Sequence, residues 1–207
     1  MKQLRNTCWL FLSALCVTFL LSSCNSGETN STSTADSSAT TVEPPMADTS
    51  TAGNNTSKLT DPEIASVAVT ADQIDIDYAN IAKEKSKNAD VLKFAATMAK
   101  DHQSVNDQAV ALATKLGVTP KDNATTQSLL AGAVDTKAML NSKSGADFDK
   151  AYINNEVAYH KAAISLVENT LIPDAENAEL KSLLQSALPI FKEHLEHAEM
   201  IQKQVSK

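Results

Sequence analysis

Polar and apolar residues alternate along most of the chain after residue 60 with a spacing of three and four. The segment from residue 89 to 116 shows this pattern most clearly. One of its faces carries Val91, Ala95, Met98, His102, Val105, Ala109, Leu112 and Leu116. The segment from residue 175 to 205 has a similar face, made of Leu180, Leu184, Ala187, Phe191, His194, Ala198 and Ile201. Such spacing is typical of helices that bury one stripe in a bundle, so an all-α domain is predicted.

Local signals set the expected helix ends. Asp61 followed by Pro62 predicts a helix start, with Asp61 as the cap. Asn88 can cap a second helix, which Gly117 should end. Pro189 lies within the last helical segment and should kink it just before His194. The predicted helices span residues 61–87, 89–116, 124–140, 146–169 and 175–205.

The lengths of the connections predict the topology. Four helices are long, and the first and last connections between them are short, which predicts two antiparallel hairpins. The connection over residues 118–145 is long enough to cross the bundle, and it contains a helical piece of its own. We therefore expect a ferritin-like four-helix bundle with a long, partly helical crossover between helices two and three. A plain up-and-down bundle and a five-helix arrangement are the alternatives.

The buried stripes of three different helices each carry a histidine: His102, His160 and His194. Glu156 lies one turn before His160, and Asp75 lies on the inner stripe of the first helix. Imidazole and carboxylate groups together suit Zn, Fe, Mn or Cu. These five residues are therefore the candidate ligands of a divalent transition metal.

Other interpretations of the same residues stay open. A single inward histidine is more often hydrogen-bonded within a polar layer of the core than bound to a metal. The spacing also differs from the di-iron motif, which needs two Glu-x-x-His pairs, because Glu156 and His160 are four residues apart. Met98, one turn before His102, is either a soft ligand suited to copper or a core residue. His197 falls off the inner stripe, so we expect it to be solvated or at the edge of the core.

The first 23 residues have the pattern of a lipoprotein signal peptide. Lys2 and Arg5 precede an apolar run over residues 9–21, which is short for a membrane span. The run ends in Leu-Ser-Ser-Cys at residues 21–24, the pattern of a bacterial lipobox. We therefore expect a lipid on Cys24, which would anchor the protein to a membrane.

A Ser/Thr-rich segment follows the expected anchor. Almost half of residues 25–60 are Ser or Thr, and bulky apolar residues are scarce. Such a composition cannot bury enough surface to offset the loss of conformational entropy on folding. We therefore interpret residues 24–60 as the lipidated cysteine and a disordered tether, and residues 61–207 as one folded domain.

Cysteine usage and charge exclude several classes of function. All three cysteines lie within the first 24 residues, so the expected mature domain has no disulfide framework and no thiol chemistry. Without Lys2 and Arg5, the chain keeps 16 lysines against 25 acidic residues, a net charge of −9. An acidic surface without arginine argues against nucleic-acid binding. No Ser-His-Asp arrangement or paired carboxylates are evident, so an enzymatic function has the least support.

Three segments of the chain resemble a known bacterial family. They read LKFAATMAKDHQSVNDQAVALATKLGV, FDKAYINNEVAYHKAAISLVE and LPIFKEHLEHAEM. The residues that carry the resemblance are Asp101-His102, Phe148-Asp149, Tyr152, His160, Leu188-Pro189 and His194. The family is catalogued as domain of unknown function 4142, and the resemblance covers about residues 66–204. It implies a ferritin-like fold and an outer-membrane location, but no established activity. Asp75 stands where a glutamate is expected in the first helix of the family.

Two hypotheses of function follow from the sequence. In the first, a membrane-anchored envelope lipoprotein binds or buffers a divalent transition metal through the stripe histidines. In the second, a non-catalytic interaction or stress-protection module has histidines with purely structural roles. Both place the protein in the bacterial cell envelope, at the outer membrane, with the membrane as partner through Cys24. Convergence of the three stripe histidines would favour the first hypothesis.

Overall fold

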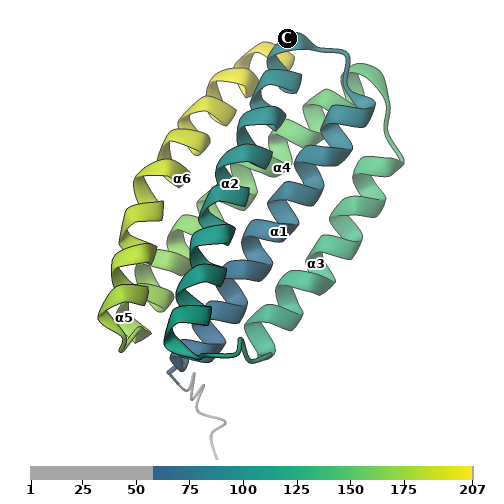
Figure 1. The fold of residues 1–207 in the computed structure, drawn as a ribbon. Coiled ribbons are helices and arrows are strands. Elements are labelled where there is room, and N and C mark those ends of the chain that lie inside the picture. The colour runs from purple at the N-terminus through teal and green to yellow at the C-terminus, as the bar shows by residue number, and fades with distance from the viewer. Residues whose placement is uncertain (1–57, 207) are drawn as a thin grey trace, which may run out of the picture. The chain divides into compact units, whose positions relative to one another are not determined.

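The computed structural model describes residues 58–206, and every element in this range is helical (Figure 1). The all-α prediction is thereby confirmed for this range. The expectations for the signal peptide, for Cys24 and for most of the tether lie outside it. The elements are α1 (Asp61–Lys85), α2 (Ala89–Leu116), α3 (Ala124–Asn141), α4 (Gly145–Leu166), the π-helical turn η1 (Val167–Leu171), α5 (Ile172–Asp174) and α6 (Ala178–Val205).

The start of α1 differs from the sequence prediction. Thr60, not Asp61, is the cap residue of α1, and its backbone N–H donates to Glu63 Oε2 at 3.0 Å. Asp61 instead accepts hydrogen bonds from the backbone N–H groups of Glu176 and Asn177, both at 2.9 Å. A Ser/Thr residue followed three residues later by Glu is a capping box. The corrected role of Asp61 is therefore to tie the start of α1 to the segment before α6.

The other helix ends follow local signals. The side chain of Asn88 accepts from the second and third N–H groups of α2, and Gly117 ends that helix with a positive φ of 66°. The last helix begins at Ala178, three residues later than predicted, because Asn177 caps it. The third long helix changes to a π-helical turn at Val167, where the sequence predicted a regular helix to residue 169.

The direction of α3 decides how the other helices are oriented. Lys121, just before α3, donates its backbone N–H to Pro62 O at 2.9 Å, so α3 starts beside the start of α1. At the other end, Lys85 donates to the backbone oxygens of Leu140 and Asn141 at 3.0 and 2.6 Å. The helix therefore runs parallel to α1 and carries the chain back to the end of the bundle where α2 began. Figure 1 shows it alongside α1.

As a result, α2 and α4 run from the same end of the bundle, and α1 and α6 run toward that end. Two apolar clusters fill the interior along this direction. The first cluster, nearer that end, includes Tyr78, Phe94, Met98, Tyr152 and Ile201. The second, nearer the other end, includes Ile64, Val105, Leu171, Leu180 and Phe191. Buried polar residues lie between the two clusters in each of the four helices.

Over residues 58–206, none of the helices has the length and apolar character that a membrane span requires.

Candidate metal centre

Candidate ligands from α1, α2, α4 and α6 lie at a similar height along the bundle, because α2 and α4 begin at the end where α1 and α6 finish. Counted from the end where α2 and α4 begin, the offsets along the helices are 10 residues for Asp75, 11 for His194, 13 for His102 and 15 for His160. At about 1.5 Å per residue, these positions differ by only about one and a half helical turns. The residues therefore form one polar layer between the two apolar clusters.

His102 is held from α1. Its Nδ1 lies 2.8 Å from Asp72 Oδ1, and its ring stacks on Phe191 with an interplanar angle of 8°. A carboxylate beside Nδ1 fixes the ring with the Nδ1–H donating, as in the carboxylate–histidine pairs that support metal ligands. The other nitrogen, Nε2, points toward Asp75 at 2.9 Å, but the two groups are not aligned for a hydrogen bond.

His160 is held by its own helix. Its Nδ1 donates to the backbone carbonyl of Glu156 at 3.0 Å. Because a carbonyl only accepts, Nδ1 carries the proton and Nε2 keeps its lone pair. This Nε2 atom lies 3.4 Å from Asp75 Oδ2 and has no hydrogen-bond partner within residues 58–206.

His194 is held from α2. Its Nε2 donates to Asp101 Oδ2 at 3.2 Å. Its Nδ1 is buried, and no hydrogen-bond partner for it exists in the described part of the chain. Each of the three histidines thus uses one nitrogen for positioning, and its other nitrogen has no hydrogen-bond partner among the described residues.

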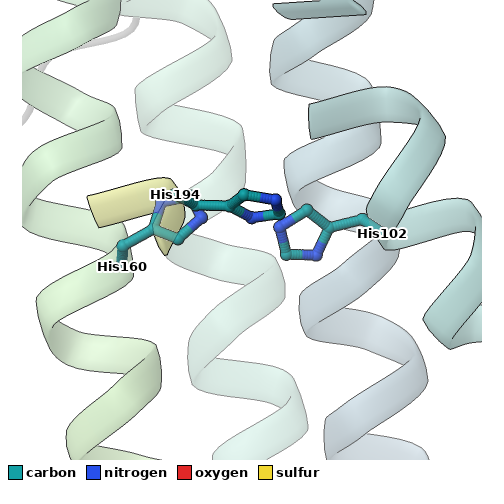
Figure 2. Close-up of side chains that lie close together, drawn as sticks. All are labelled: His102, His160 and His194. Carbon is teal, nitrogen blue, oxygen red and sulfur yellow. The ribbon is translucent and has the colours of Figure 1, made fainter. Parts of the chain in front are cut away.

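The three histidine side chains converge. Figure 2 shows the rings of His102, His160 and His194 turned toward one another from α2, α4 and α6. Ligand atoms of these three residues lie within 4.8 Å of one another, and all three side chains are buried. The sequence placed them on inner stripes, and the structure brings them to one point.

Two carboxylates complete the cluster. Asp75 and Glu156 are fully buried, and together with His160 they also offer ligand atoms within 4.8 Å of one another. Both Asp75 oxygens and Glu156 Oε2 lack a hydrogen-bond partner among the described residues. Two donor atoms bound to one ion at about 2.1 Å lie about 3.0–3.4 Å apart. The distances of 2.9 and 3.4 Å from Asp75 Oδ2 to the two histidine nitrogens are close to this spacing.

Burial and mutual charge shift the titration of the cluster. Burial opposes a charge on His102, but Asp75 and Asp72 outweigh it and raise the pKa of His102 to about 10. Burial likewise opposes a charge on Asp75, but His102 and His160 bring the pKa of Asp75 down to about 2. Burial and the negative charge of Asp75 raise the pKa of Glu156 well above its usual value.

The other two histidines shift the opposite way. Burial and the charge of His102 lower the pKa of His160, and the same two causes lower the pKa of His194 to about 4. Both rings are therefore neutral at pH 7. A neutral imidazole is the form that binds a metal.

The structure shows contacts that the sequence could not give. Asp75, one of the five candidates from the sequence, lies 2.9 Å from His102 Nε2 and 3.4 Å from His160 Nε2. Asp72 and Asp101, which position His102 and His194, were not predicted. Asp72 could have been found from its place three residues before Asp75, on the same helix face. Asp101 has no such signal, because its neighbour His102 faces inward.

Two further expectations can be compared with the structure. Met98 belongs to the first apolar cluster, which agrees with a role as a core residue. His197 is half-buried and meets the ring of Phe94 edge to face at a centroid distance of 5.3 Å. It therefore lies at the edge of the core, one turn away from the convergent nitrogens.

Comparison with known proteins gives one family and one solved structure. The family described as "Domain of unknown function (DUF4142)" matches residues 46–201. The solved structure of CopM in the Cu(II)-bound form is similar with a TM-score of 0.55 and 14% sequence identity, over 71% of this chain and 98% of that chain. At this identity the likeness concerns the fold alone. No curated protein sequence matches the chain significantly.

Proposed function

The chain belongs to the DUF4142 family, and we propose that it binds a divalent transition-metal ion in the polar layer of its helical domain. The ligands are His102, His160, His194 and Asp75, with Glu156 as a further carboxylate within reach. One observation carries the proposal: three buried imidazoles, each fixed through one nitrogen, offer ligand atoms within 4.8 Å of one another, and two of them approach the buried carboxylate of Asp75 at 2.9 and 3.4 Å.

The unengaged atoms favour a ligand over a self-contained polar layer. Buried polar groups in proteins are nearly always hydrogen-bonded, because an unpaired one costs about 1–3 kcal/mol. Here three imidazole nitrogens and three carboxylate oxygens meet at one level without hydrogen-bond partners among the described residues. A bound cation would satisfy these atoms together and would neutralise the buried charge of Asp75.

The donor set limits the ion. Imidazole nitrogen and carboxylate oxygen suit Zn, Fe, Mn and Cu, whereas Mg and Ca prefer sites made only of oxygen. Cu(II) is the first ion to test, because CopM, which resembles this chain in fold, has been solved with Cu(II) bound. A metal binds the neutral form of an imidazole. Because the pKa of His102 is raised to about 10, an ion that binds this ring must displace a proton from it.

The proposed setting is the bacterial cell envelope. The lipobox ending at Cys24 supports a lipid anchor, and the Ser/Thr-rich tether would separate the domain from the membrane. The proposed location is the outer membrane, and the proposed role is to bind or buffer metal there. The inward-facing candidate ligands on two antiparallel helix pairs, α1 with α2 and α4 with α6, support assignment to the ferritin-like four-helix bundles, as does the helical crossover between the pairs.

A structural role of the histidines is the second candidate. The observation that favours it is the double pairing of His102, with Asp72 on one side and Asp75 on the other. A protonated His102 between two carboxylates would hold α1 and α2 together without any metal. The protein would then be a non-catalytic interaction or stress-protection module.

Metal analysis of the purified protein decides between the two candidates. The protein is stripped with a chelator, reloaded with Cu(II), Zn(II), Mn(II) or Fe(II) in separate samples, desalted and measured by elemental analysis. We expect about one ion per chain for at least one of these metals, and loss of the ion in Asp75→Ala. Retention of none of the four ions would refute the metal proposal and leave the structural one.

A further inference from the structure

An apolar cavity lies on the other side of His102 from the first apolar cluster, between α1, α2, α4 and α6. Its volume is about 190 Å³. An engineered apolar cavity of about 150 Å³ is large enough to bind benzene. The cavity runs through the second apolar cluster, and alanines such as Ala68, Ala109 and Ala163 line it from three helices. Their small side chains leave this space open.

The cavity is long and narrow. Along α2 it is lined from His102 to Leu116, and along α6 from Asn177 to Phe191. Each of these stretches has 15 residues, and its 14 steps of 1.5 Å give a length of about 21 Å. A volume of about 190 Å³ spread over this length is a tube. A tube fits an unbranched chain better than it fits a compact ring.

The polar side chains that line the cavity are engaged elsewhere. Asp72 pairs with His102, Tyr159 donates its hydroxyl to the Ala71 carbonyl at 2.8 Å, and Asp61 accepts two backbone N–H groups. A buried water needs two to four polar partners, so the apolar length of this cavity is unsuited to water. An apolar molecule is the better occupant.

The two ends of the cavity differ in exposure. His102, Asp72 and Phe191 are buried at one end, whereas Asp61, Leu116 and further residues at the other end are half-buried. The open end is thus the one where α1 begins and α2 ends (Figure 1). A chain would enter there and extend toward the polar layer, leaving its polar head at the surface.

We propose that this cavity binds the unbranched hydrocarbon chain of an amphiphile, either a free fatty acid or the acyl chain of a lysophospholipid. The tail lies among the alanines and leucines of the second apolar cluster, and its end approaches His102. This proposal does not depend on metal binding, because His102 at the buried end is the one proposed metal ligand among the residues that line the cavity.

Isothermal titration calorimetry of the chelator-treated protein with octanoate, decanoate and dodecanoate tests the proposal. We expect saturable one-to-one binding that tightens about fourfold for each added methylene. Native mass spectrometry with dodecanoate and with a lysophospholipid then shows which source of the chain binds. Affinity that does not change with chain length, or binding without saturation, would overturn the proposal.

Two substitutions on α2 form a matched pair. Ala109→Leu places a larger side chain in the middle of the cavity, while Ala111→Leu adds the same atoms at an exposed position two residues away. Ala109→Leu should weaken dodecanoate binding at least tenfold, and Ala111→Leu should bind like the unmodified protein. Equal weakening by both would overturn the assignment of the site to this cavity. Ala163→Leu, from α4, repeats the test if Ala109→Leu does not fold.

Discussion

His194→Ala should remove most of the thermal stabilisation that a bound metal provides, whereas His197→Ala should leave it nearly intact. The two residues lie three positions apart on α6. The ring of His194 lies 5.2 and 5.4 Å from the rings of His102 and His160, between ring centroids, whereas His197 packs against the ring of Phe94. Both are histidines on one helix and differ in the direction they face, which makes the contrast a sharp test.

The expected size of the effect follows from mass action. At a free metal concentration of about 100 times Kd, one site stabilises the native state by about 2.7 kcal/mol. For a domain of about 150 residues, that corresponds to a rise in Tm of about 5–11 °C. Loss of a residue that only hydrogen-bonds a metal ligand weakens metal binding by up to about 100-fold. Loss of a ligand itself should weaken it by about 100-fold or more. The same metal concentration then stabilises His194→Ala by only about 0.4 kcal/mol, or about 1–2 °C.

Differential scanning fluorimetry with and without metal measures this shift. Each variant is compared with its own metal-free Tm, because His194→Ala also removes the hydrogen bond to Asp101 and lowers the baseline. Equal loss of the shift in both variants would show that the inner face of α6 has been misplaced. A full shift in His194→Ala would show that this histidine is not a ligand.

Three further predictions concern the anchor, the helix cap and pH. Cys24→Ala should move the protein from the membrane fraction to the soluble fraction, and unchanged fractionation would contradict the lipid anchor. A chain that begins at residue 58 should melt like the full-length protein, whereas one that begins at residue 61 should lose about 0.5–2 kcal/mol with the Thr60 capping box, as measured by urea denaturation. In chelator, burial beside His102 keeps the pKa of His194 at about 4, below the unfolded value of about 6.5. The stabilisation from neutral His194 is therefore complete above pH 6.5 and is lost as the pH falls toward 4. His194→Gln should flatten this dependence of the unfolding free energy, and an unchanged slope would refute the assignment.

Local sequence signals determined most of the helices, because capping and periodicity act within a few residues. Asn88 and Gly117 mark the start and the end of α2, as predicted. The Asn88 side chain accepts hydrogen bonds from backbone N–H groups in the first turn, and Gly117 adopts the left-handed conformation at the end of the helix. The predicted cap of α1 was wrong, because the neighbouring residue is the better capping residue. Thr60 takes the cap of α1 because Glu63 stands three residues later, and Asp61 is left to bind another segment.

The sequence also determined which residues face inward. Periodicity placed His102, His160 and His194 on buried stripes, and all three are buried in the structure. That inference is local to each helix, because a stripe requires only a spacing of three and four. It could not show whether the three residues meet.

Only the tertiary structure decided that they do. The parallel course of α3 along α1 makes α2 and α4 start from the same end of the bundle, and this brings the histidines to one level. The positioning roles of Asp72 and Asp101 and the central place of Asp75 follow from contacts between residues about 30 to 90 positions apart. The same holds for the apolar cavity, whose lining stripes look like ordinary core positions in the sequence. A stripe specifies which side of a helix is buried, whereas the distance between facing helices depends on how all of them pack together.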